Sequence, residues 1–175
     1  MAEIVKTVKI TKDKIAIFLD TSKTITSSDW KPDWKRIAKS TIFDMAFNPQ
    51  SSTEDYIAYE TPIEEVSGYQ PEIPQEIAMY RGDPIYEFIE ALVYDLQAGD
   101  SLRVPCLVMF PPKIGSDGKL DGEIIAWQIP ECRLLLSNMN SVEGKITFTL
   151  KLGGTYDRGT VTLLDGKPTF VVSGT

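Results

Sequence analysis

The sequence predicts a mainly β protein, a β-sandwich or partly closed barrel with one packed α-helix. Two observations support this fold class. Apolar residues recur at every second position through most of the chain, which is typical of half-buried strands, and one segment repeats them at helical spacing. The 175 residues contain no internal repeat and no linker, and a chain of this length buries roughly 70% of its unfolded surface. We therefore expect residues 1–175 to form a single domain.

The pattern of apolar residues in the first third of the chain predicts a hairpin and then a long strand. Apolar residues alternate from Val8 to Leu19 around the polar turn Lys12-Asp13-Lys14, which indicates a β-hairpin. Trp30 and Trp34 follow in a polar stretch, and they either fold back on the core or are buried against a neighbouring subunit. Residues 37–47 alternate again and predict a strand, as do residues 54–63 and 75–81.

One helix is expected at about residues 84–97. Asp83 suits its N-cap and Pro84 its first position, where a missing N–H is harmless. Apolar residues from Ile85 to Leu96 follow the helical period, and Gly99 suits the C-terminal end.

The chain after the helix is predicted to be β again. Residues 102–110 alternate but contain Pro105, which favours an edge or bulged strand. Further strands are expected at 125–129, at 132–136 after a bend at Pro130, and at 146–152, and Asp165-Gly166 suits a type I′ hairpin turn. Cys106 and Cys132 lie in apolar stretches and are interpreted as small buried residues rather than a disulfide.

Charge is distributed unevenly. Residues 1–43 carry a net +4, residues 44–100 carry −12 with Arg81 as the single basic residue, and residues 101–175 carry +1, which sum to −7. The acidic block is either a solvated face or a surface that docks against the basic N-terminal third of another copy. A net negative chain does not favour nucleic-acid binding through a basic patch.

No motif of enzyme chemistry is found. The sequence has no histidine, no phosphate-binding glycine loop and no metal-ligand spacing, and its Asp-Gly pairs and Gly153-Gly154 are typical of turns and bends. Paired carboxylates could support catalysis, but nothing singles out one acid among the candidates Glu60, Glu64, Glu65, Glu72 and Glu76. We expect a non-enzyme without a cofactor. The first ten residues contain no signal-like apolar run and no stretch is long enough to cross a membrane, so we expect a cytoplasmic chain without membrane contact.

Residues 48–76 predict an interaction arm. The segment is acidic and carries three tyrosines and four prolines, which stiffen it and so reduce the entropy lost on docking. Tyrosine combines a large contact area with a polar end and favours interfaces over cores. An arm that grips a different surface of an identical copy makes a heterologous contact, which produces rings or filaments.

This middle third resembles the major tail tube protein of long-tailed bacteriophages, of the siphophage type that infects Gram-positive bacteria. The residues that carry the resemblance are Asn48-Pro49-Gln50, Thr53, Tyr56-Ile57, Gly68-Tyr69, Pro71, Gln75 and Gly82-Asp83-Pro84. The flanking thirds agree with the family only in their strand pattern.

The resemblance implies a β-sandwich flanked by a helix, assembled as hexameric rings that stack into a hollow tail tube. In that family a long loop reaches neighbouring subunits, and the tube conducts the genome from the virion into the host cell. The implied location is the virion tail, assembled in the host cytoplasm. The implied partners are further copies of the chain, the tape measure and the tail terminator, and DNA passes through without specific binding.

A ring of six chains would carry about −42, so part of the acidic block must meet basic groups. We expect the inter-subunit contacts to include Tyr56, Tyr59, Glu60, Glu64, Glu65 and Tyr69 on the arm and Lys6, Lys9, Lys12 and Lys14 in the N-terminal segment 1–35. The alternatives are the tube of a contractile tail or of a type VI-like secretion system, a baseplate component, and, from another class, a small ligand-binding β-barrel.

Overall fold

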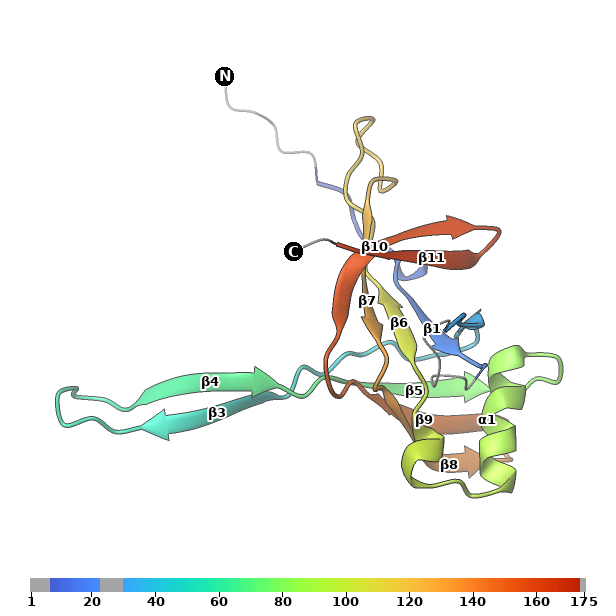
Figure 1. Cartoon of the computed structure of the whole chain (residues 1–175), viewed down its shortest axis with the longest axis horizontal. Helices are drawn as coiled ribbons and strands as arrows, with labels where there is room; N and C mark the ends of the chain where they lie inside the picture. The colour runs from blue at the N-terminus through green and yellow to red at the C-terminus, as the bar shows by residue number, and fades with distance from the viewer. Residues whose placement is uncertain (1–6, 23–29, 174–175) are drawn as a thin grey trace.

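The computed structural model describes residues 7–22 and 30–173, and in this part of the chain it consists of strands with one α-helix (Figure 1). The strands are β1 (Ala16–Asp20), β2 (Trp34–Arg36), β3 (Pro49–Glu54), β4 (Ile63–Tyr69), β5 (Glu72–Ala78), β6 (Cys106–Met109), β7 (Ile124–Ile129), β8 (Arg133–Asn140), β9 (Lys145–Lys151), β10 (Asp157–Leu164) and β11 (Lys167–Val172). The helix is α1 (Pro84–Tyr94), and two short 3-10 helices span Lys12–Lys14 and Gly99–Leu102. The expected fold class is confirmed.

The strands form three antiparallel sheets. A curled six-stranded sheet has the order β11-β10-β7-β6-β1-β2, a three-stranded sheet has the order β5-β9-β8, and β3 pairs only with β4. The main core lies between the two larger sheets and α1, where Leu19, Ile89 and Phe148 are buried together. A smaller cluster around Phe18 and Leu107 covers the other face of the six-stranded sheet.

The expected hairpin at residues 8–19 is wrong. Lys12–Lys14 form a 3-10 turn, in which Lys14 N donates to Thr11 O at 3.0 Å, and residues 7–11 belong to no strand. β1 is buried along its whole length and pairs with β2 on one side and β6 on the other. Because both of its edges are occupied, β1 leaves no position at which residues 8–10 could pair.

The two tryptophans after β1 fold back on the protein. Asp20 is fully buried, and its carboxylate accepts hydrogen bonds from Trp30 Nε1 at 2.8 Å and from the backbone N–H groups of Ser22 and Asp33 at 2.9 Å. Trp34 packs against the smaller core cluster. The buried Asp20 carboxylate therefore holds both Ser22, which follows β1, and Trp30 and Asp33, which precede β2.

The strand expected at residues 37–47 is also wrong. The backbone of this segment pairs with β5 through isolated bridges, Ser40 to Ile77 and Ala46 to Glu72, and not as a continuous strand. Between the two bridges this segment advances six residues, from Ser40 to Ala46, whereas β5 spans five, from Glu72 to Ile77. The two backbones therefore cannot remain in register. Met45 still packs against the core, which explains the alternating pattern, whereas Phe43 and Phe47 are about half exposed.

The helix begins as predicted and ends early. The Asp83 carboxylate accepts from the backbone N–H groups of Ile85 and Tyr86, each at 3.0 Å, and Pro84 is the first helical residue. The helix stops at Tyr94 because Leu96 adopts a φ of 42° and the chain turns back there, with Gln97 N bonded to Leu92 O. Gly99 instead begins the second 3-10 helix.

The later strands follow the sequence pattern, with one correction. β6 lies between β1 and β7, so Pro105 precedes an interior strand and not an edge or bulged one. β7, β8 and β9 are confirmed, and the turn between β10 and β11 has positive φ at both Asp165 and Gly166, as a type I′ turn requires. Cys106 and Cys132 are free and buried, and burial raises the pKa of the Cys106 thiol.

Candidate functional site

The most conspicuous feature of the molecule is a hairpin that projects from the body, made of β3 and β4 (Figure 1). The strand predicted at residues 54–63 is wrong, because residues 55–62 form the turn of this hairpin. Every residue of β3 is exposed, and β4 is exposed except at Ile63 and Gly68, which are half-buried. We call residues 49–69 the arm; residues 72–76 lie in β5 and belong to the body. An isolated two-stranded hairpin is marginally stable in water, so the pairing of β3 with β4 alone stabilises the arm only weakly.

The tip of the arm carries apolar side chains in solvent. Ile57 is completely exposed, and Tyr56 and Tyr59 are about half exposed with their rings edge to face at 6.4 Å. Further down the arm, Val66 and Tyr69 are also more than half exposed. Such a cluster is typical of an interaction surface.

The acidic residues of the arm have no cationic partner among the residues that the structure describes. Glu54, Asp55, Glu60, Glu64 and Glu65 form no ion pair there, and Glu64 accepts only a hydrogen bond from Ser51 Oγ at 2.6 Å. The arm therefore combines unpaired negative charge with exposed aromatic rings.

Four carboxylates of the acidic block outside the arm are ion-paired within the chain: Glu72, Glu76, Glu90 and Asp100. Arg81, the one basic residue of the block, binds Glu90, and Tyr86 OH donates to the same carboxylate at 2.8 Å. On the outer face of the three-stranded sheet, Lys151 pairs with Glu72. The five acidic residues of the arm thus form no ion pair in the described part of the chain, whereas half of those outside the arm do.

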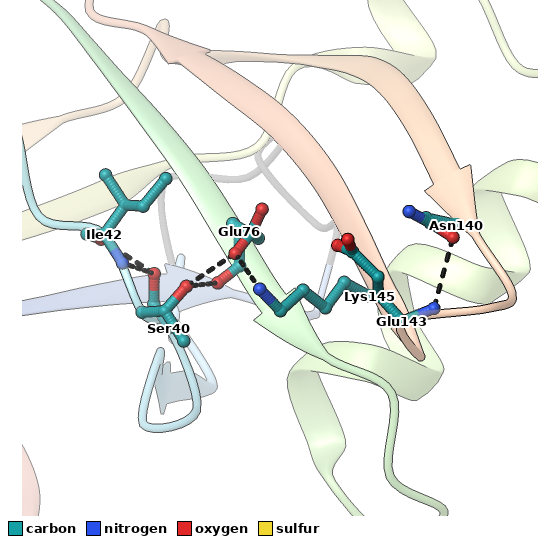
Figure 2. A network of polar contacts seen from close by, with 7 residues as sticks. Ser40, Ile42, Glu76, Asn140, Glu143 and Lys145 are labelled. Atoms are coloured by element: carbon teal, nitrogen blue, oxygen red, sulfur yellow. Dashed lines mark hydrogen bonds and ion pairs between the residues drawn. The ribbon is translucent and has the colours of Figure 1, made fainter.

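The pair of Glu76 and Lys145 is the best defined of these contacts. Lys145 Nζ lies 2.6 Å from Glu76 Oε1, and Thr41 Oγ1 donates to the same oxygen at 2.8 Å; Figure 2 shows the lysine reaching across from β9 to β5. The lysine bond first, and the threonine bond second, hold the pKa of Glu76 below its ordinary value, and the same pair raises the pKa of Lys145. Glu72 and Glu76 are therefore structural acids, and neither fits the catalytic alternative.

Lys12 and Lys14 lie in the 3-10 helix that directly precedes β1 of the body, and Lys9 lies just before it in the chain. Lys9 and Lys12 are exposed, whereas Lys14 is half-buried with its Nζ 3.7 Å from Asp13. Lys6 lies outside the described residues. Lys9, Lys12 and Lys14 form no ion pair with the arm of their own chain in the described ranges.

A pocket of about 670 Å³ lies where the arm joins the body. Trp127, Ile129 and Leu152 of the body line one side, and Phe47 and Tyr69 at the base of the arm line another. Tyr156 also lines it and packs on Trp127, with ring centroids 4.9 Å apart. Sequence reasoning missed this pocket because residues far apart in the chain, such as Tyr69 and Trp127, line its two sides.

Arg158 is a further residue that the sequence did not single out. It is the direct cross-strand partner of Trp127, so both side chains lie on the same face of the sheet. Arg158 is exposed and forms no ion pair within the described part of the chain. A cation without an ion pair in the described residues thus lies beside Trp127, which lines the pocket.

A second pocket, of about 790 Å³, lies beside β1 and β2 and is partly covered by residues 37–43. Lys12, Asp13 and Arg36 lie on its lining. Arg36 Nη2 donates to Asp13 O at 3.4 Å, so an acidic residue already lies among these cations.

Within residues 7–22 and 30–173, no group of three or more potential metal ligands occurs. In those ranges no helix is long and apolar enough to span a membrane.

Comparisons with known proteins place the fold. No family model and no curated protein sequence matches the chain. A chain in the tail of an empty gene transfer agent particle, computed by helical refinement with C6 symmetry, superposes with a TM-score of 0.52 over 85% of this chain and 97% of that chain, at 13% identity. The chain has a tail-tube-like fold. A chain of the native gene transfer agent virion gives a TM-score of 0.50 over 86% of this chain and 98% of that chain, at 12% identity. At such identities the likeness establishes the tail-tube-like fold, and the function has to be argued from the residues.

Proposed function

We propose that this protein is a structural subunit of a tail tube, which assembles into six-membered rings that stack into a hollow conduit for a genome. The observation that carries the proposal is the arm, which projects from a chain with a tail-tube-like fold. Its tip exposes apolar side chains, and its acidic residues form no ion pair among the described residues. Such an arm is explained by burial against another copy.

Sixfold assembly is supported by the C6 symmetry of the gene transfer agent tail with which this chain shares its fold. In a ring of this kind we assign Tyr56, Tyr59, Glu60, Glu64, Glu65 and Tyr69 to one side of the subunit contact. Lys6, Lys9, Lys12 and Lys14 are assigned to the other side as counter-charges for acidic residues of the block, and they are not assigned as the seat of the arm tip. The exposure of Lys9 and Lys12 supports this assignment, because neither is committed to an ion pair in the described ranges.

The proposed role is passive and non-catalytic. A net charge of −7 per chain repels phosphates, so a tube of these chains would let DNA slide through without holding it. The proposed location is the tail of a virion, where the tape measure and the tail terminator would contact the tube.

Electron microscopy of the concentrated chain tests this proposal. We expect rings or tubes from the natural sequence. The matched variant shortens the arm by joining Gln50 to Gly68, which are cross-strand partners, through an Asn-Gly turn. It keeps the body intact and should remain monomeric, as checked by sedimentation velocity and circular dichroism.

Two results would contradict the proposal. Natural chains that stay monodisperse monomers at all concentrations would remove it and would favour the ligand-binding β-barrel. Tubes formed equally well by the shortened chain would show that the arm is not the assembly element.

A further inference from the structure

We propose that the pocket at the base of the arm is the seat for the arm tip of a second copy of this chain. In this contact Ile57 and its flanking tyrosines enter the pocket, and an acidic side chain of the tip pairs with Arg158. The inference rests on the proposed function, because it names the surfaces through which one subunit would hold the next.

The tip and the pocket of one chain cannot meet. Phe47 and Tyr69 line the pocket at the base of the arm, whereas Ile57 lies in the turn beyond the ends of both strands. β3 has six residues, and at about 3.3 Å per residue it separates the tip from its own pocket by about 20 Å. An occupant that is a tip must therefore come from another copy.

The apolar surfaces of the two partners correspond. The tip offers one aliphatic and two aromatic side chains in solvent, and the pocket offers Trp127, Ile129 and Leu152 beneath a rim that includes Tyr156. Burial of one aromatic side chain removes about 150–250 Å² of surface from water. Docking of the tip would therefore bury apolar surface of Tyr56, Ile57 and Tyr59 that is exposed in the single chain.

The charges correspond as well. Asp55 and Glu60 flank the apolar residues of the tip, and Arg158 lies opposite Trp127 of the pocket. None of these three charged residues has an ion-pair partner in the described part of its own chain. The residues that line the pocket at the arm base are uncharged, whereas the lining of the second pocket includes Lys12, Asp13 and Arg36, which would have to be desolvated by an apolar tip. The apolar lining therefore favours the pocket at the arm base as the seat.

The contact would also propagate. Each chain carries a tip and a seat at opposite ends of one arm, so every docked copy leaves its own seat or tip free for the next one. Such a heterologous contact closes into a ring or extends into a filament.

A photo-crosslinking experiment on assembled full-length chains tests the inference. Ile57 is replaced with benzoylphenylalanine, which an exposed position tolerates, and labelled chains are mixed with ¹⁵N-labelled natural chains before irradiation. Mass spectrometry should place the crosslinks on Trp127, Leu152 or Tyr156 of the isotopically different chain. Tyr156→Ala in the receiving chain should weaken association by about tenfold.

The same probe at Val142 serves as the matched control, because this side chain is 95% exposed at the turn between β8 and β9. It should give no crosslinks into the pocket. Assemblies whose Ile57 crosslinks map to the second pocket, to the β2 edge or within one chain would overturn this inference and leave the proposed function standing. Absence of any assembly would overturn both.

Discussion

Arg158 and Trp127 lie directly opposite each other across the β10–β7 pair, so a cation with no ion pair among the described residues shares a sheet face with the indole that lines the pocket. In the proposed contact, this relationship would place a counter-charge for the arm at a defined position on the receiving chain. It leads to the first prediction.

Arg158→Glu and Glu60→Lys should each weaken self-association, because each leaves like charges facing across the proposed contact. The double variant restores an opposite-charge pair and should recover most of the loss, which we expect to be roughly tenfold for each single change. Sedimentation velocity at low and high salt measures both effects. Strictly additive losses in the double variant would show that the two side chains do not meet.

Ile57→Asp should abolish or strongly weaken assembly without lowering the melting temperature of the monomer. The reason is that the Ile57 side chain is fully exposed and is not part of the core of its own chain. Val142→Asp is the matched control, since it places the same charge at another exposed hairpin turn. Light scattering and differential scanning calorimetry separate association from stability. Equal effects of the two variants on assembly would indicate a general charge effect and argue against the arm.

Glu76→Gln should make stability less dependent on pH on the acid side. The pKa of Glu76 is lowered in the folded state, mainly by Lys145, so its contribution is fully present above the ordinary value of 4.5 and is lost as pH falls through the lowered folded value. The melting temperature of the natural chain should therefore drop more steeply below about pH 4.5 than that of the variant. Parallel curves for the two chains would mean that this ion pair contributes nothing to acid stability.

Asp20→Ala should lower the free energy of unfolding by about 3 kcal/mol, because it leaves Trp30 Nε1 and two backbone N–H groups without their buried acceptor. Asp13→Ala removes an exposed carboxylate nearby in sequence and should change stability by less than about 0.5 kcal/mol. Urea unfolding followed by tryptophan fluorescence measures both. A small loss for Asp20→Ala would show that water replaces the carboxylate at little cost.

Elements with a strong local pattern could be predicted from the sequence. β9 alternates cleanly because one of its faces packs on the core and the other meets solvent, and the start of α1 is fixed by Asp83 and Pro84. The turn at Asp165-Gly166 was likewise predicted, because few residue pairs tolerate two positive φ angles.

Elements whose structure depends on distant pairing could not be predicted. β3 consists of the polar residues 49–54 and forms a strand only because β4 lies beside it. The alternation at 37–47 came from a segment that packs Met45 on the core without staying in register with β5. The exposure of the arm was expected from its composition, whereas the pocket and Arg158 depend on the packing of β7 and β10 against the base of the arm.

In the described part of the chain, β3 and β4 pair only with each other, and this isolation also has a kinetic consequence. Two free subunits that meet for the first time must order a hairpin that neither of them holds firmly, and this entropic cost opposes the first encounter. A subunit that joins an existing end meets a seat whose surroundings are already fixed, so growth should be faster than initiation. We expect assembly to show a lag that preformed fragments abolish, and free subunits would then persist until a template presents the first seat.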